Sequence, residues 1–196
     1  MFICIAGMPG SGKGVVTRAA KDLGLPVIVM GDFIRREAAR RGLEATPENM
    51  NKLAKMLREE QGKDVIARLV LEEADKISSE VIVVDGVRSL EEVNKLQERG
   101  RVIIIAVHAS PRTRFKRLLE RRRPGDPSTW REFIERDMVE LGFGLGNVIA
   151  LADYMIINEG DEEEAYTRAL QILGEILDGK DKSGSRGKTY RRREQG

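Results

Sequence analysis

The sequence predicts an α/β fold in which a five-stranded parallel sheet carries helices on both faces. Five short segments are apolar and mostly β-branched, and helical patterns separate each from the next. Strands that alternate with helices form parallel sheets, and burial on both faces makes such strands continuously apolar. A glycine-rich segment follows the first strand directly. The predicted strands are residues 2–6, 27–30, 81–85, 102–107 and 154–157.

The glycine-rich segment has the composition of a phosphate-binding loop. Its members are Gly7, Met8, Pro9, Gly10, Ser11, Gly12, Lys13, Gly14 and Val15. Glycines let backbone N–H groups approach phosphate oxygens, the helix that follows directs its positive dipole end at the same anion, and the lysine adds a full charge. The alternative is a glycine-rich turn that binds nothing, but the coincidence of glycines, lysine and strand favours the phosphate-binding loop.

The last position of this pattern points to a family. Gly14 stands where a Ser or Thr usually holds Mg²⁺. The segment thereby resembles adenylate kinase and its relatives, which carry G-x-P-G-x-G-K-G and hold the metal mainly through water and phosphate. Residues 1–178 as a whole resemble nucleoside monophosphate kinases of the P-loop superfamily, including archaeal adenylate-kinase-related proteins. The resemblance implies a three-layer P-loop kinase domain with a helical acceptor-binding insertion over 32–79 and a short lid over 121–136.

Length and composition fit one domain of this kind. A chain of 196 residues with 41% apolar residues can bury one good-sized core. The first apolar run is too short to span a membrane and lacks the shape of a signal peptide. Cys4 is the sole cysteine and is predicted to be a buried structural thiol, so a cytoplasmic location follows by default. Neither the lone His108 nor any other pattern indicates a zinc site.

Residues 179–196 form a basic tail. Seven Lys and Arg residues from position 180 onward stand against Asp181 and Glu194, so the tail carries +5 and the rest of the chain −3. The tail has almost no apolar side chains and is expected to be disordered. A solvated extension without function is the simpler interpretation, and electrostatic contact with nucleic acid is the alternative.

The sequence pattern of residues 32–79 predicts three helices between the second and third strands. We expect helices over 33–41, from Thr46-Pro47 onward, and over 64–77 after the break at Gly62. A helical appendage above the carboxyl ends of the strands is a natural place for a second substrate.

Acidic and basic side chains follow the second and third strands. Asp32 and Arg35 match the G-D-x-x-R of adenylate kinases, and Arg88 completes a D-G-x-x-R that begins at Asp85. The resemblance implies that Asp32, Arg35 and Arg88 belong to the acceptor site, with both arginines on the acceptor's phosphate. Asp85 is predicted to steer hydrated Mg²⁺. The alternatives are plain surface arginines and a helix-capping carboxylate.

A dense arginine run follows the fourth strand. Arg117 and Arg121 lie four residues apart, on one helix face, so both can reach a common anion. Together with Arg122 they match the R-x-x-x-R-R of nucleoside monophosphate kinases, which serves ATP phosphates, and Arg136 follows on the return limb of the lid. A closing lid would carry these arginines to the transferring group. The alternative is a nucleic-acid-binding patch, which the lack of aromatic neighbours in the sequence disfavours.

Residues 152–160 resemble the A-D-x-x-I-x-N-x-G of dephospho-coenzyme A kinases. The resemblance implies that Asn158 and Gly160 lie against the adenine of ATP, and the alternative is a plain turn. Adenylate kinases have Thr where Val15 stands and a Gln, which reads the acceptor adenine, where Glu92 stands. A carboxylate only accepts hydrogen bonds and suits guanine better than adenine, so AMP is not assured as acceptor.

These observations predict an ATP- and Mg²⁺-dependent kinase that transfers the γ-phosphoryl group to a small nucleotide-type acceptor. Lys13, Arg121, Arg122 and Arg136 are predicted to neutralise the transition state. A dephospho-coenzyme A kinase is the first alternative, supported by residues 152–160. A nucleic-acid-associated ATPase or nucleotide-dependent switch is the second, and a sensor that binds nucleotide with little turnover is the third.

Overall fold

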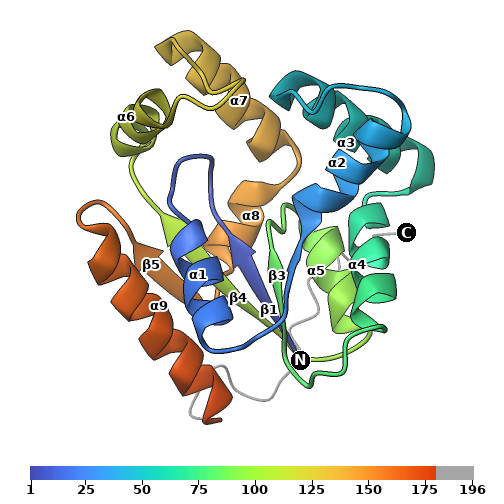
Figure 1. Ribbon diagram of the computed structural model, residues 1–196, viewed down its shortest axis with the longest axis vertical. Helices are drawn as coiled ribbons and strands as arrows, with labels where there is room; N and C mark the ends of the chain where they lie inside the picture. The colour runs from blue at the N-terminus through green and yellow to red at the C-terminus, as the bar shows by residue number, and fades with distance from the viewer. Residues whose placement is uncertain (180–196) are drawn as a thin grey trace, which may run out of the picture.

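A computed structural model describes residues 1–179, so the rest of the predicted tail lies outside the described residues. The elements, in chain order, are β1 (Phe2–Ala6), α1 (Gly14–Asp22), β2 (Val27–Val29), α2 (Met30–Arg40), α3 (Pro47–Gln61), α4 (Val65–Ala74), β3 (Ile82–Asp85), α5 (Leu90–Gln97), β4 (Val102–His108), α6 (Pro111–Arg121), α7 (Trp130–Gly142), α8 (Leu145–Ala150), β5 (Tyr154–Ile157) and α9 (Glu162–Leu177). Figure 1 shows their arrangement.

The strands form one parallel sheet in the order β2-β3-β1-β4-β5. The first strand lies at the centre, where Ile3 is in register with Val83 of β3 on one side and Ile103 of β4 on the other. The prediction of a five-stranded parallel sheet with helices on both faces is confirmed. Because all strands run the same way, their carboxyl ends meet at one edge, the edge from which the glycine-rich loop emerges.

Alternate residues of β1, β3 and β4 supply two separate core layers. Phe2, Cys4 and Ala6 of β1 pack on one face of the sheet with buried residues of α2, α3, α4, α5 and α8. Ile3 and Ile5 pack on the other face with α1 and α9. Burial on both faces explains why the strands are continuously apolar. The thiol of Cys4 is free and buried, as predicted, and burial raises its pKa.

Several predicted boundaries shift. The second strand ends at Val29 instead of residue 30, and α2 begins at Met30, so Gly31 and Asp32 lie in the first turn of a helix and not in a loop at the strand end. An acidic residue in the first turn suits the helix dipole, which favours helix at this place. The start of α3 is as predicted, because the hydroxyl of Thr46 accepts a hydrogen bond from the Asn49 N–H at 3.2 Å ahead of Pro47.

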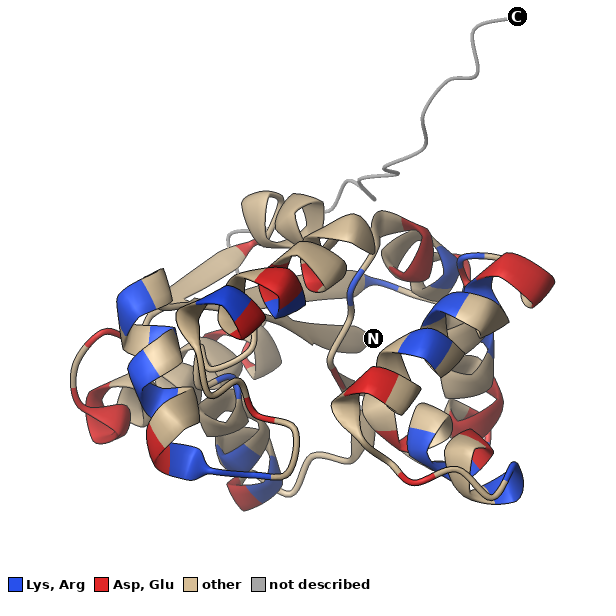
Figure 2. Ribbon diagram, turned by 90° about the horizontal axis from the view of Figure 1, so that it is seen from above, with Lys and Arg blue, Asp and Glu red and all other residues tan. Residues whose placement is uncertain are grey.

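The insertion and the lid stand on opposite sides of the glycine-rich loop. Figure 1 shows α2 and α3 on one side of the loop and α6 and α7 on the other. The tip of the lid reaches across to the insertion, since a Cβ at Gly125 would overlap the Pro47 ring at the start of α3. Figure 2 shows that acidic and basic residues are interspersed on these helices, not separated by sign.

Candidate phosphotransfer site

Three glycines of the loop are required by close contacts. A Cβ at Gly7 would lie 2.7 Å from the backbone oxygen of Val107, and one at Gly10 would lie 2.7 Å from that of Arg114. Gly12 has a φ of +83°, and a Cβ there would overlap the side-chain nitrogen of Asn158. The loop is therefore held between β4, α6 and the turn after β5. These contacts fix the curved backbone that an anion-binding loop needs.

The start of α1 lies at the end of this loop, without a cap from any described side chain. Lys13 is its N-cap, and within the described residues no side chain caps the helix and none of its first-turn residues is acidic. The positive end of the helix dipole is thus open to a phosphate, while the N–H groups of Val15 and Val16 donate to the backbone oxygens of Gly12 and Lys13 at 3.1 Å. Burial lowers the pKa of Lys13 from its ordinary value of 10.5, against the opposing attraction of the Asp85 carboxylate.

The carboxylate of Asp85 has one free oxygen beside Lys13. Its Oδ2 accepts a hydrogen bond from the Thr17 hydroxyl at 3.0 Å, while its Oδ1 is buried and has no partner among the residues described. The alternative of a helix cap does not hold, because Ser89 caps the next helix, α5. A buried carboxylate oxygen without a protein donor fits hydrated Mg²⁺, whose waters would supply the missing donors.

The buried carboxylate of Glu140 pairs with Arg88, and the charges of Lys13 and Arg136 also act on it. Arg88, after β3, donates from Nε to Glu140 of α7 at 2.7 Å, and the side chain of Glu140 is only 7% exposed. Burial by itself would raise the pKa of Glu140, but the charge and hydrogen bond of Arg88 outweigh it, and Lys13 and Arg136 add to the effect. The pKa of Glu140 therefore lies below its ordinary value of 4.5.

A second buried ion pair ties the phosphate-binding loop to the lid helices. Arg114 of α6 donates from both terminal nitrogens to Asp137 of α7, at 2.8 and 2.6 Å, and from Nη1 to the backbone oxygen of Pro9 at 3.1 Å. Its guanidinium also lies over the ring of Phe133, with the carbon 4.8 Å from the ring centroid. The position of the loop thus depends on the position of α7.

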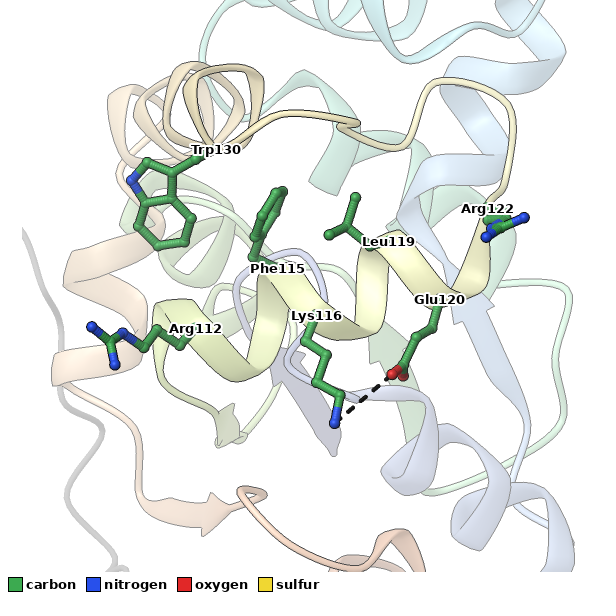
Figure 3. A pocket seen from close by; sticks show the side chains of 7 residues that line it. All are labelled: Arg112, Phe115, Lys116, Leu119, Glu120, Arg122 and Trp130. Carbon is green, nitrogen blue, oxygen red and sulfur yellow. Dashed lines mark ion pairs between the residues drawn. The ribbon is translucent and has the colours of Figure 1, made fainter.

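Two of the predicted catalytic arginines share one carboxylate of the lid. Arg121 donates from Nε to Asp126 at 2.8 Å, and Arg136 donates to the same residue at 3.2 Å. Burial of Asp126 is outweighed by these hydrogen bonds, so its pKa is lowered from its ordinary value of 3.8. Arg122 differs from its neighbour: it lines a pocket with Arg112 and Lys116 (Figure 3). A role for Arg122 at the loop requires its side chain to turn round.

The predicted adenine contacts lie beside Arg117. The amide of Asn158 is buried; it donates to the Ser11 backbone oxygen at 2.9 Å and accepts from Arg117 at 3.2 Å. The backbone oxygen of Gly160 also accepts from Arg117, at 3.3 Å. The structure brings these three residues together, and Asn158 already fixes the phosphate-binding loop. Their contact with adenine stays a prediction.

The insertion places Arg35 in a different setting from Arg88. Arg35 pairs with Asp32 one turn earlier on α2, with an Nε to Oδ1 distance of 2.9 Å, and both side chains are 52% exposed. The pair lies on the helix surface. Their contact with the acceptor stays a prediction.

Glu92 is fully buried at the start of α5. One carboxylate oxygen accepts from Arg58 of α3 at 2.6 Å and the other from the backbone N–H of Arg88 at 2.8 Å. The guanidinium carbon of Arg58 also lies 4.7 Å from the ring centroid of Phe143. The side chain of Glu92 does not face solvent. Reading of an acceptor base by Glu92 stays a prediction, and it requires Arg58 to give up this place.

Sequence patterns missed the carboxylates that hold the arginines. Asp126, Asp137 and Glu140 all lie in or beyond the lid turn, and each pairs with an arginine that is distant in the sequence or on another element. The available signal was the i, i+3 spacing of Asp137 and Glu140, which places two acids on one side of α7. Arg58 and Thr17 gave no signal, since each lies in an ordinary helical pattern.

The described residues have the α/β fold of the P-loop kinases, with the glycine-rich loop after the first strand. Residues 6–134 match the family model described as AAA domain. A UPF0200 protein of Hyperthermus butylicus is 55% identical over 179 residues, which cover 90% of this chain and 95% of that protein. The chain belongs to the AAA domain family and to the UPF0200 proteins.

Solved structures with low sequence identity share the fold. TT1252 from Thermus thermophilus has a TM-score of 0.63 at 19% identity and covers 90% of this chain and 97% of its own. A shikimate kinase from Acinetobacter baumannii, solved in complex with shikimate, has a TM-score of 0.57 at 20% identity, covering 91% and 94%. Within residues 1–179, none of the helices combines the length and the apolar character needed to cross a bilayer.

Proposed function

We propose that the protein is an ATP- and Mg²⁺-dependent phosphotransferase that moves a γ-phosphoryl group to a small nucleotide-type acceptor. The observation that carries the proposal is the gathering of Lys13, Arg88 and Arg136 around the buried carboxylate of Glu140 beside the phosphate-binding loop. Phosphoryl transfer depends on positioning and charge neutralisation, so cations fixed near one loop are the machinery it needs. The Acinetobacter baumannii protein that shares this fold is a shikimate kinase, solved in complex with shikimate.

Each part of the site has a role in this proposal. The phosphate-binding loop and Arg117 hold the phosphates of ATP, with Asn158 and Gly160 against its base. Lys13, Arg121, Arg122 and Arg136 neutralise the transition state. Asp32, Arg35 and Arg88 hold the acceptor, whose base Glu92 reads. Asp85 would hold hydrated Mg²⁺, which when bound would offset the charge of the phosphates.

The test is transfer of label from γ-labelled ATP to a panel of acceptors. The panel contains AMP, GMP, CMP, UMP, the deoxynucleotides and dephospho-coenzyme A, offered to the full chain and to a chain that ends at residue 178. We expect transfer to one acceptor, unchanged by loss of the tail. Lys13→Ala should reduce the rate on the order of a hundredfold or more, because it removes a charge that acts in the transition state. An unchanged rate in this variant contradicts the assignment.

Two other functions are separated by the same panel. Transfer to dephospho-coenzyme A alone identifies a dephospho-coenzyme A kinase, the alternative that the resemblance of residues 152–160 suggests. Absence of transfer, with ATP hydrolysis that rises on addition of RNA, identifies a nucleic-acid-associated ATPase.

A further inference from the structure

A second pocket lies on the side of α6 that faces away from the phosphate-binding loop. Its volume is about 720 Å³, and Figure 3 shows the side chains that line it. Phe115, Leu119 and Trp130 form its apolar part, and Arg112, Lys116 and Arg122 form its basic part. The loop contacts α6 through other residues, since Gly10 faces Arg114 and Leu118. The pocket is thus separate from the site described above.

The aromatic part of the pocket is firmly supported and open to solvent. The rings of Phe115 and Trp130 meet edge to face, with centroids 5.3 Å apart. Trp130 also packs on Phe133, at 5.0 Å, and Phe133 is fully buried. Trp130 nevertheless keeps 45% of its surface exposed. An indole held in place with one side open is a stacking platform for a planar ligand.

Basic side chains border this platform along α6. Figure 3 shows Arg112 at one end of the pocket, Arg122 at the other and Lys116 between them. Glu120 is the one acid that lines the pocket within the described residues, and it lies 3.9 Å from Lys116. Ten residues of helix separate the two ends, or about 15 Å. The pocket therefore offers net positive charge over a length that exceeds one phosphate group.

Arg122 follows the last residue of α6 and lines the far end of the pocket. Arg122 has a φ of +49°, and among residues 1–179 no other residue except glycine has a positive φ. Arg121, just before it, pairs with Asp126. The two adjacent arginines thus lie in different places, Arg121 with the lid carboxylate and Arg122 at the outer pocket. A left-handed residue is a common way to end a helix, and here the Arg122 N–H donates to the Leu118 backbone oxygen at 3.3 Å.

We propose that this pocket binds single-stranded nucleic acid, with an unpaired base stacked on Trp130 and neighbouring phosphates paired with Arg112, Lys116 and Arg122. The sequence argument against such a site was the lack of aromatic neighbours, and the fold supplies them by bringing Trp130 against Phe115. An exposed aromatic ring bordered by cations is the usual platform for single strands. A second copy of the chain fits less well, because pairing two such surfaces places like charges together.

Trp130 is the sole tryptophan of the chain, so its fluorescence reports on this pocket alone. We expect a 12-nucleotide single-stranded oligo(U) to quench the emission of the full chain saturably, and the matched duplex to quench it much less. The three cations predict a slope of about −2 for the logarithm of the association constant against the logarithm of the salt concentration, at about 0.7 per phosphate for single strands.

Variants on the outer face of α6 separate the pocket from the basic tail. Arg112→Ala combined with Lys116→Ala leaves Trp130 in place and should weaken binding by roughly tenfold or more, and flatten the salt slope by about 1.4. Arg131→Ala is the matched control, because Arg131 follows Trp130 directly, is 89% exposed and pairs with Glu135 outside the pocket. The control should bind as the unchanged chain does.

Each other outcome overturns the proposal. Absence of quenching, or equal quenching in the double variant, assigns any binding to another part of the chain, the tail included. A change in Trp130 emission that depends on protein concentration and not on oligo(U) assigns the pocket to self-association. Quenching by single strand and duplex alike contradicts base stacking.

Discussion

Arg35 and Arg88 occupy matching places in two similar sequence patterns, yet the structure gives them opposite surroundings. Arg35 pairs with Asp32 on the surface of one helix, and both side chains are half exposed. Arg88 reaches across to Glu140 on another element, where the carboxylate is almost fully buried. The first pair forms because its residues lie one turn apart on the same helix. The second pair forms because the packing of the fold brings two distant elements together.

The difference shows where charge is energetically important in this molecule. A surface ion pair contributes little, because water screens both partners. A buried pair has lost its water, so removal of one partner leaves an uncompensated charge. Glu140 and Asp137 of α7 are both of the second kind, and they connect α7 to Arg88 and to the phosphate-binding loop. The lid helix and the site are therefore coupled through buried charges.

The largest effect on stability is expected at Arg114, which is the most buried residue of the two ion pairs that α7 makes with Arg88 and Arg114. Arg114→Leu removes both hydrogen bonds to Asp137 and leaves that carboxylate buried, which should lower the free energy of unfolding by about 3–5 kcal/mol. Urea unfolding measures it. Arg131→Ala, an exposed partner of Glu135 on the same helix as Asp137, should change it by less than about 0.5 kcal/mol. Similar losses in both variants would remove the distinction between buried and surface pairs.

A comparison of Glu140→Gln with Asp32→Asn addresses the two arginines directly. Glu140→Gln keeps the shape and one acceptor but removes the charge that faces Arg88, and should destabilise the fold by about 2 kcal/mol. Asp32→Asn should cost about 0.5 kcal/mol or less. Double-mutant cycles with Arg88→Ala and Arg35→Ala measure the two coupling energies by urea unfolding. Equal coupling energies would show that burial does not make the Arg88–Glu140 pair stronger than the Arg35–Asp32 pair.

A smaller effect is expected in the pH dependence of stability, and it tests the pairing of Glu140 with Arg88 independently. The pKa of Glu140 is lower in the folded chain than its ordinary value of 4.5, so the unfolded chain binds more protons between the two values. The stabilisation is fully present above the unfolded pKa and is lost as the pH falls through the folded pKa. Unfolding of the unchanged chain and of Glu140→Gln should therefore differ most at neutral pH and converge as the pH falls from 4.5 through the folded pKa. Parallel curves from pH 7 to pH 3 would contradict a lowered pKa for Glu140.

The sheet and the phosphate-binding loop were predictable from local sequence. Strands buried on both faces are continuously apolar, and the glycines of the loop are fixed by contacts that only a bare backbone allows. The start of α2 was not predictable, because the three residues of β2 run straight into a helix. The partners of the arginines were not predictable either. Glu140 meets Arg88 from 52 residues away, and sequence spacing carries no information about such a contact.

The most direct test compares Arg88→Ala with Arg35→Ala in transfer of label from γ-labelled ATP to the acceptor that the panel identifies. If the buried network positions the acceptor, Arg88→Ala should lower kcat/KM for the acceptor on the order of a hundredfold, and Arg35→Ala by less than about tenfold. Both variants should keep the KM for ATP. Equal losses in the two variants, or the absence of transfer to every acceptor by the unchanged chain, would contradict the account.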